Sequence, residues 1–395
     1  MTNTFIPEHG KRTTLRDVAR EAGVSIKTVS RVVNEEPLVN EATAARVTDA
    51  VKRLGYRPNE LARSLKGQRS RTIGLVIDDV SNPFMATCAQ AIEGVAREHG
   101  HALVLCDSHA DLRQESDYVG LLTQRQVDGL LIVPAWGHDS HLEAEQEAGL
   151  PVVAFDRPAE GVSADTVLVE NREGTREATE HLIDHGHERI AFVGDVRHFY
   201  TARKRLEGYK EALEAARLQP LHALDAHTIG QGVEAAKGFL DAPDPPTALF
   251  AANILTTLGA LRAIEDLGLR IPQDVAVIGF DDFELAYVLR PRFTLVRQPA
   301  AELGRRAAQL LFDRLEGENY PEPRRLVLPT ELGALGVFFL SGQVGAGTAP
   351  YVIACLIIFM FFTVGGLQVM GWLTGSEVYP LGVRGAGTSA QAATL

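Results

Sequence analysis

The chain has 395 residues, which is too long for one ordinary domain and indicates two or three. Hydrophobic residues make up 45% of it and charged residues 23%, so extensive disorder and collagen-like repeats are excluded. Its three cysteines, Cys88, Cys106 and Cys355, lie far apart and form no CxxC pair. A disulfide scaffold and a structural zinc site are therefore not expected, in keeping with a reducing cytosol. The N-terminus has no basic-then-apolar signal segment, so we expect the main body not to be exported.

Charge is distributed unevenly along the chain. Residues 11–71 hold 14 Lys and Arg against 7 Asp and Glu, a net charge of +7, whereas the rest apart from Glu8 carries −18. A basic module joined to an acidic body is typical of a protein that binds a polyanion through one part and senses a signal through the other. A solvated charged face would give the same balance, so charge alone leaves both interpretations open.

The first predicted element is a short amphipathic helix near the N-terminus. Thr14 can cap it, and Asp17, three residues later, can complete a capping box. Gly23 supplies a tight turn, and Ser25 can cap a second helix over residues 26–33. A short helix, a glycine turn and a second helix are the parts of a DNA-binding helix-turn-helix.

The second helix carries the side chains that would meet DNA. Three valines would face inward, which leaves Ile26, Lys27 and Arg31 outside, near the end that enters the major groove. Lys and Arg can donate to guanine O6 and N7, whereas Ile can only contact a thymine methyl. Short polar side chains nearby suit phosphate oxygens, which fix register without reading sequence: Ser25, Thr28, Ser30 and Asn34. A third helix near residues 41–54 would close the small core, an arrangement that other helical bundles share.

A second motif, GYRPNELARSLK, follows at residues 55–66. Together with DVAREAGVSIKTVSRVVN at residues 17–34, it closely resembles the lactose/galactose repressor (LacI/GalR) family of bacterial transcription regulators. The resemblance implies that residues 59–66 are a hinge, which folds into a short helix when a dimer sits on its operator. It also implies DNA contacts at Asn59, Leu65 and Lys66, with Leu65 wedged into a minor-groove base step. Such apolar wedging kinks the duplex and brings more protein surface onto it; a plain linker is the alternative for the unbound state.

Between residues 72 and 332, short apolar runs alternate with helical stretches. Strands are predicted at residues 72–77, 102–106, 129–133, 151–155, 189–193, 247–251 and 274–279, and helices near 83–99 and 112–124. This alternation predicts parallel sheets covered by helices on both faces. Ligands bind at the carboxyl ends of such strands, where carboxylate and amide groups match the hydroxyls of a sugar or the edges of a small polar metabolite. The polar residues at these ends are Asp78, Asp79, Asn82, Asp107, Asp156, Arg157, Asp195, Asn253, Asp281 and Asp282.

The resemblance to the same family continues through the body. SNPF, VDGLLIVP, FDRP, HGHERIAFVGD, RLEGY, IPQDVAVIGFDD and TLVRQPAAELG look like its sequence blocks, so the resemblance covers about residues 13–332. It implies a periplasmic-binding-protein fold of two α/β lobes, with effector contacts at Asp156, Thr201, Arg205, Asn253, Asp281 and Gln298. Arg205 and Asp281 are the strongest candidates, because an arginine opposite carboxylates can clamp a hydroxyl or carboxylate. Ile254 stands where the family usually has Asp, which removes one possible polar contact and leaves the effector class open.

The sequence holds no pattern of catalytic residues. A nucleophile elbow, a P-loop and the HExxH spacing of metalloproteases are all missing from it. His181 and His185 have a spacing that could bind a metal, but with His187 we expect them on an exposed helix end and loop. We therefore predict neither an enzyme, nor a cofactor, nor a metal site.

Residues 333–395 differ from the rest of the chain. Residues 332–376 contain no charge, and the apolar run Tyr351–Val369 approaches the roughly 20 residues that cross a bilayer; a buried core helix is the alternative. GWLTGSEVYPLGVRG at residues 371–385 resembles the sugar-porter branch of the major facilitator superfamily. One or two spans cannot form a transport path alone. The tail is interpreted either as a fusion accident or as a membrane anchor near residues 351–370, with Arg384 on the cytoplasmic side.

The sequence thus predicts an α/β protein in four parts. These are an all-α helix-turn-helix domain at 1–57, a hinge and linker at 58–71, a two-lobed effector-binding and dimerisation domain at 72–332, and a transporter-like tail at 333–395. We interpret the chain as a cytoplasmic bacterial repressor, a homodimer that grips a palindromic DNA operator under the control of a small-molecule effector, a sugar or related metabolite. The alternatives are a membrane-tethered regulator and a ligand-binding protein without DNA activity. Whether the effector releases DNA or promotes binding stays open.

Overall fold

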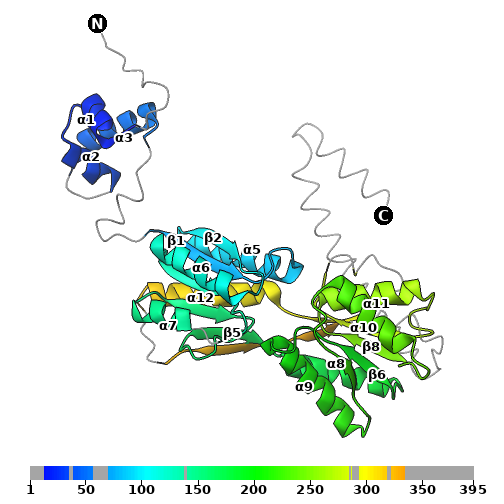
Figure 1. Ribbon diagram of the computed structural model, residues 1–395. Helices are drawn as coiled ribbons and strands as arrows, with labels where there is room; N and C mark the ends of the chain where they lie inside the picture. The colour runs from blue at the N-terminus through cyan, green and yellow to red at the C-terminus, as the bar shows by residue number, and fades with distance from the viewer. Residues whose placement is uncertain are drawn as a thin grey trace, which may run out of the picture. The chain divides into compact units, whose positions relative to one another are not determined.

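The computed structural model describes residues 13–34, 39–56, 70–137, 140–283, 286, 293–317 and 322–333 (Figure 1). The described residues form an N-terminal helical domain and a body that divides into two compact units. We name these units the first lobe (residues 70–170, 198–201 and 299–328) and the second lobe (171–197, 202–298 and 329–333). The long runs of chain change lobe after Glu170, Gln298 and Leu328.

The N-terminal domain consists of three short helices, α1 (Leu15–Ala22), α2 (Ile26–Val33) and α3 (Glu41–Leu54). The predicted capping box is present, with the Thr14 amide donating to Asp17 Oδ2 at 2.9 Å. Gly23 ends α1 at a φ of 63°, a left-handed conformation that glycine adopts without a Cβ clash. Six buried side chains from all three helices form the core: Val18, Ala19, Ala22, Val29, Val47 and Ala50.

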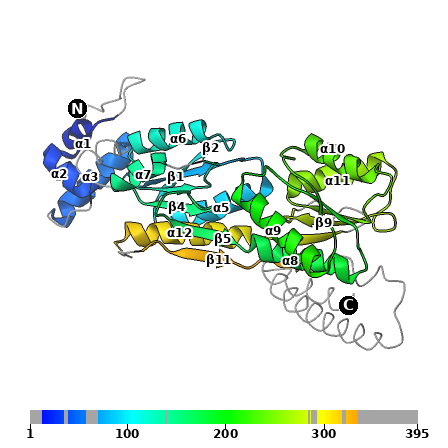
Figure 2. The same ribbon diagram turned by 60° about the horizontal axis from the view of Figure 1, so that its bottom comes forward.

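The first lobe contains a six-stranded parallel sheet with helices on both faces. Its strand order is β11-β5-β4-β3-β1-β2. The strands are β1 (Thr72–Ile77), β2 (Ala102–Asp107), β3 (Gly129–Ile132), β4 (Val152–Phe155), β5 (Asp165–Val169) and β11 (Arg325–Leu328). Helices α5 (Pro83–Glu98) and α12 (Ala300–Leu315) pack their apolar sides on one face. Helices α6 (Leu112–Gln124) and α7 (Ser140–Glu147) cover the other (Figure 2).

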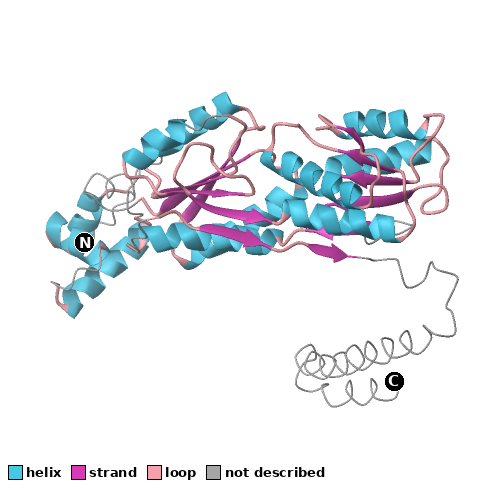
Figure 3. Ribbon diagram, turned by 90° about the horizontal axis from the view of Figure 1, so that it is seen from below, coloured by secondary structure: helices cyan, strands magenta, loops and turns pink. Residues whose placement is uncertain are grey.

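The second lobe repeats this architecture. Its sheet has the order β12-β10-β9-β8-β6-β7, in which only β12 runs antiparallel to its neighbour. Helices flank the strands of each lobe (Figure 3). The strands are β6 (Ile190–Val193), β7 (Leu221–Ala223), β8 (Ala248–Ala251), β9 (Ala276–Phe280), β10 (Thr294–Arg297) and β12 (Glu331–Gly333). Helices α8 (Asn171–Asp184) and α9 (Tyr200–Ala215) cover one face. Helices α10 (Ile229–Leu240) and α11 (Ile254–Asp266) cover the other and cross at Gly232 and Gly259, where a Cβ on Gly259 would lie 2.8 Å from backbone atoms.

All seven strands predicted from the sequence are present, each within two residues of its predicted bounds. Both predicted helices of the body, near residues 83–99 and 112–124, are present as α5 and α6. The sequence analysis did not predict β5, β7, β10, β11 or β12, and it therefore missed the polar residues that follow β5. The two lobes with parallel sheets agree with the predicted fold class.

Two predicted segments fall outside the described residues. These are the hinge with Asn59, Leu65 and Lys66, and the tail with the predicted membrane helix near residues 351–370. Among the helices that the structure describes, none is both long enough and apolar enough to cross a membrane.

Candidate DNA interface and effector-binding residues

Exposed side chains gather at the N-terminal end of α2. Ile26 is 44% exposed, and Lys27 beside it is exposed as well. Arg31, one turn later, is half-buried. On the opposite side of the helix, Val29 is fully buried in the domain core. The helix therefore fixes a cationic and an apolar side chain at the outward-facing start of α2, as a major-groove reading helix requires.

The short polar side chains of this domain have local partners. Ser25 caps α2 by accepting the Thr28 amide at 3.1 Å, and the two hydroxyls lie 2.9 Å apart. At the other end of α2, Asn34 Nδ2 donates to Ser30 Oγ at 3.4 Å. These contacts hold hydroxyl and amide groups at both ends of the helix, where they can also donate to phosphate oxygens.

The residues at the carboxyl ends of β4, in the first lobe, and β9, in the second lobe, share one local geometry. Asp156 follows β4 with a φ of 63°, and Asp281 follows β9 with a φ of 79°. Their amides donate to the carbonyl oxygens of Val167 and Val296 on the neighbouring strands, both at 2.9 Å. A left-handed conformation is unfavourable for residues other than glycine, and such strain is concentrated at binding sites. Of the eight described non-glycine residues with a positive φ, Asp156 and Asp281 are the two that directly follow a strand.

In the first lobe, a buried ion pair lies beside Asp156. Arg157 is 7% exposed and bonds Asp78, which follows β1, and its Nε lies 3.6 Å from Asp156 Oδ2. The guanidinium carbon lies 4.1 Å from the ring centroid of Phe199, and Nη1 donates to the Pro134 carbonyl at 3.4 Å. Asp78 Oδ1 is buried without a hydrogen-bond partner among the described residues. It can accept a hydroxyl from a ligand.

In the second lobe, Arg205 projects from α9 into a polar cluster and is 6% exposed. Its Nε donates to Asn171 Oδ1 at 2.7 Å and its Nη1 to the Ala252 carbonyl at 2.6 Å. The guanidinium carbon lies 3.8 Å from the ring centroid of Phe280, a cation–π contact. The arginine is thus held on three sides, with its orientation fixed before any ligand arrives.

Asp281 lies in the same cluster and accepts a hydrogen bond from Gln298 Nε2. Burial raises the pKa of Asp281 above its ordinary value, against the opposing effects of the Arg205 charge and of the Gln298 hydrogen bond. The nearby Asp195 carboxylate acts in the same direction as burial. Asn253 donates to Asp195 at 2.7 Å and caps α11 by accepting the Thr256 amide at 2.8 Å. The cluster therefore presents charged and amide groups that are expensive to bury and are suited to a polyhydroxylated ligand.

The structure distributes the six predicted effector residues between the lobes. Arg205, Asn253, Asp281 and Gln298 belong to the cluster of the second lobe, whereas Asp156 and Thr201 belong to the first lobe. Five of the six are buried, and Asn253 is half-buried: Asp156 4%, Thr201 6%, Arg205 6%, Asp281 5% and Gln298 7% exposed. The sequence analysis missed Asn171, Phe199 and Phe280. Asn171 follows β5, so a correct prediction of that strand would have revealed it.

Other strand-end residues have structural roles in the described structure. Asp79 accepts the Ser81 amide at 2.8 Å, and Asn82 caps α5 by accepting the Phe84 amide at 3.0 Å. Asp107 accepts the amides of Val80 and His109, each at 3.0 Å. Asp282 accepts Arg297 Nε at 2.8 Å. These residues are therefore not included among the candidate effector contacts.

Of the three histidines predicted to be exposed, His185 is exposed, whereas His181 and His187 are half-buried. His181 is on the last part of α8, and His185 and His187 follow its end. Burial, together with the nearby His185, lowers the pKa of His181. Within the described residues, no group of three or more His, Cys, Asp and Glu side chains is arranged to hold a metal ion.

Known proteins match both the helix-turn-helix domain and the two-lobed body of this chain. Residues 14–59 match the family described as bacterial regulatory proteins, lacI family, and residues 179–334 match the periplasmic binding protein-like domain. The ribose operon repressor of Escherichia coli is 37% identical over 321 residues, which span 80% of this chain and 97% of that repressor. The structure of the transcriptional regulator CelR–cellobiose complex is 37% identical and covers 82% of this chain and 98% of its own, with a TM-score of 0.61. The lac repressor dimer bound to operator and the anti-inducer ONPF is 29% identical with the same coverage and a TM-score of 0.74.

Proposed function

Because the chain belongs to the LacI family of bacterial regulatory proteins, we propose that it acts as a homodimer on a palindromic operator. It is a DNA-binding transcriptional repressor that responds to a sugar or related metabolite, and the family consists of regulators rather than enzymes. The observation that carries the DNA-binding role is the outward-facing start of α2, with its exposed Lys27 over a fully buried core side. The chain works in the bacterial cytoplasm, where its operator lies.

In this proposal α2 enters the major groove. Lys27 and Arg31 donate to guanine edges and Ile26 contacts a thymine methyl. Four short polar residues bind phosphate oxygens: Ser25, Thr28, Ser30 and Asn34. Asn59, Leu65 and Lys66 of the hinge bind the minor groove, with Leu65 as the wedge. We assign residues 1–57 to the DNA-binding domain, 58–71 to the hinge and linker, and 72–332 to the effector domain.

The effector is a sugar or a similar polyhydroxylated metabolite. The supporting observation is the buried set of carboxylate, amide and guanidinium groups at strand ends, led by Arg205 and Asp281. The remaining contacts are Asp156, Thr201, Asn253 and Gln298. One relative is named the ribose operon repressor and another is described as a complex with cellobiose, so these two sugars are the first probes. Effector binding shifts the operator affinity by a coupling factor that is about 5- to 150-fold in typical allosteric proteins.

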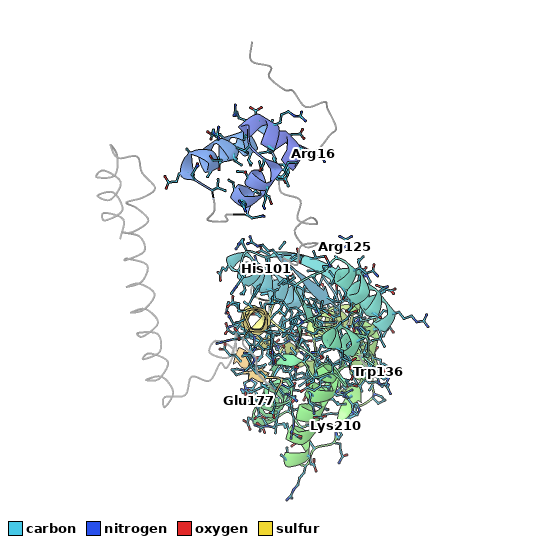
Figure 4. The ribbon with its side chains drawn as sticks, turned by 90° about the vertical axis from the view of Figure 1, so that its left-hand side faces the viewer. Arg16, His101, Arg125, Trp136, Glu177 and Lys210 are labelled. Carbon is cyan, nitrogen blue, oxygen red and sulfur yellow. The ribbon has the colours of Figure 1, made fainter. Side chains whose placement is uncertain are left out.

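Replacing Lys27 with alanine tests the DNA-binding role. The operator is first selected from random duplexes with the full chain, and affinity is then measured at one fixed salt concentration. Loss of one major-groove contact costs about 1–3 kcal/mol, so we expect operator affinity to fall by a factor of about 5 to 150. Lys210→Ala, which removes the same charge from an exposed site on α9 (Figure 4), controls for charge alone. Equal affinities of the two variants would contradict the role of Lys27 in reading the operator, and failure of the full chain to select any duplex would favour a ligand-binding protein without DNA activity.

A membrane-tethered regulator remains the second candidate, because residues 332–376 carry no charge and Tyr351–Val369 is apolar. In that case, residues 351–370 would insert in the bilayer and the operator-binding part would work from its cytoplasmic surface. Cells that express the full chain with an epitope at each end are fractionated. Co-sedimentation of both epitopes with membranes supports the anchor, and recovery of the intact chain outside the membrane fraction excludes it.

A further inference from the structure

One carboxylate fixes the chain where it enters the first lobe from the N-terminal side. Asp128, directly before β3, accepts the amides of two successive residues. The Ser70 amide donates to Oδ1 and the Arg71 amide to Oδ2, both at 2.8 Å, and Ser70 Oγ adds a bond of 3.1 Å. The Asp128 amide in turn donates to the Thr72 carbonyl at 2.7 Å. We call these contacts of Asp128 with residues 70–72 the Asp128 clamp.

The clamp holds an unfavourable backbone conformation. Arg71 has a φ of 52°, a left-handed value that a side chain with a Cβ rarely adopts. Its carbonyl accepts the Ala102 amide at 2.8 Å, so Arg71 is tied on both sides. The Asp128 side chain is 6% exposed, and His101 Nε2 lies 3.2 Å from Oδ2. Each oxygen of this buried carboxylate accepts one backbone amide, and the two bonds together hold the strained turn at Arg71. They therefore fix the direction in which the chain leaves the lobe.

Two adjacent strands connect the clamp to the candidate effector residues. β1 begins at Thr72, inside the clamp, and ends directly before Asp78, the partner of Arg157. β3 begins directly after Asp128, and the Pro134 carbonyl beyond its other end accepts Arg157 Nη1 at 3.4 Å. β1 and β3 are hydrogen-bonded neighbours in the sheet. A ligand that rearranges the Asp78–Arg157 pair therefore acts on the far ends of the two strands that carry the clamp.

We propose that Asp128 is a positioning residue that transmits the state of the effector domain to the DNA-binding domain, through the left-handed turn at Ser70–Arg71. This inference rests on the proposed function of the chain as an effector-controlled repressor. Residues 57–69, which join the clamp to the helix-turn-helix domain, lie outside the described residues, and no part of the clamp depends on them. With the clamp intact, the turn presents that segment in one direction; without it, the turn is free to relax to ordinary φ values.

The test replaces Asp128 with asparagine, which keeps the size of the side chain but can accept only one of the two amides well. Operator affinity falls about tenfold, because a smaller fraction of the molecules holds the binding-competent turn. Affinity for D-ribose or cellobiose changes little, and the effect of the sugar on operator affinity falls toward a factor of 1. The free energy of unfolding falls by about 1–3 kcal/mol, because a buried hydrogen-bond acceptor is lost. Asp111→Asn controls for the loss of a negative charge, because the exposed Asp111 accepts the amides of Arg113 at 2.8 Å and Gln114 at 3.0 Å on its Oδ1 alone, away from the clamp.

A second variant separates the clamp from a general loss of structure. Glycine adopts the left-handed conformation freely, so Asp128→Asn costs less operator affinity in an Arg71→Gly background than in the wild-type background. An equal loss in both backgrounds, a wild-type affinity of Asp128→Asn, or a parallel loss of sugar binding overturns the inference.

Amide hydrogen exchange of the free protein measures the clamp in the absence of DNA. The Ser70 and Arg71 amides are protected in the wild-type chain and in Asp111→Asn, and lose that protection in Asp128→Asn. If both amides stay protected in Asp128→Asn, the inference is overturned, whatever the operator affinity. Failure of the wild-type chain to bind any operator would instead count against the proposed function.

Discussion

Replacing Arg205 with methionine is expected to remove the effector response while the operator-binding domain stays folded. The substitution keeps a long side chain but leaves Asn171 Oδ1 and the Ala252 carbonyl without their donor. It also removes the positive charge that lowers the pKa of Asp281 against the effect of burial. A hydrogen bond to a charged group contributes about 1.5–3 kcal/mol, which is a factor of roughly 10 to 150 in affinity. Sugar affinity should therefore fall by about this factor, and the second lobe should be less stable.

Titration calorimetry with D-ribose and with cellobiose measures this loss, and operator affinity is measured alongside it. Arg203→Met is the matched control, since Arg203 is on the same helix, two residues earlier, and is exposed. Its sugar affinity should stay within about twofold of the wild-type value, as expected for an exposed site. If Arg205→Met binds sugar as well as Arg203→Met does, the cluster in the second lobe is not part of the effector site.

The second large effect is expected from Asp165→Asn, which acts on stability. The Asp165 side chain is 1% exposed at the start of β5. It accepts Arg314 Nη2 at 2.8 Å, the Arg324 amide at 2.7 Å and Arg324 Nη2 at 3.0 Å. One carboxylate thus joins β5 to α12 and to the start of β11. Because removing one partner of a buried ion pair is strongly destabilising, we expect the free energy of unfolding to fall by about 3 kcal/mol.

The pH dependence follows from the pKa of Asp165. Burial alone would raise this pKa, but the hydrogen bonds from Arg314 and Arg324 outweigh burial and hold it below its ordinary value. The group therefore stabilises the fold at pH values above the ordinary aspartate pKa of about 4, and this part is lost as the pH falls below that value. Urea unfolding at pH 7 and at decreasing pH measures it. The difference between wild type and Asp165→Asn should shrink toward low pH; a difference that is constant with pH would contradict the role of the carboxylate. Asp244→Asn at an exposed ion pair with Arg189 is the control, and little change is expected there.

The sequence predicted the elements whose signals are local. The capping box at Thr14 and the glycine turn at Gly23 are contained within a few residues, and the structure shows both. The seven predicted strands are continuous apolar runs, as expected for strands buried on both faces. By contrast, β11 is a four-residue edge strand in which Arg325 is exposed, and its partner β5 lies about 160 residues upstream. No local pattern announces such a pairing, which explains why β11 was not predicted. In β5, by contrast, all five residues are buried, so its apolar run was a local signal that went unused.

For the site, residue type and strand-end position were predictable, but partners were not. Asp78 and Arg157 are 79 residues apart in sequence and form one buried pair only because β1 and β4 both neighbour β3. Arg205 was expected from a motif, yet its partner Asn171 follows β5, which was not predicted. The left-handed conformations of Asp156 and Asp281 also become visible only in the backbone. Chemistry at a strand end can be inferred from sequence, whereas the pairing across strands needs the topology.

The most direct test of an effector-controlled repressor is the operator affinity of the full chain, measured with and without sugar on one selected duplex. We expect the selected duplexes to share a palindromic sequence. Saturating D-ribose or cellobiose should change the affinity by a factor of about 5 to 150 at constant salt. An affinity that depends on salt but neither on sequence nor on the sugar would contradict the account, because charge attraction alone would then explain the binding.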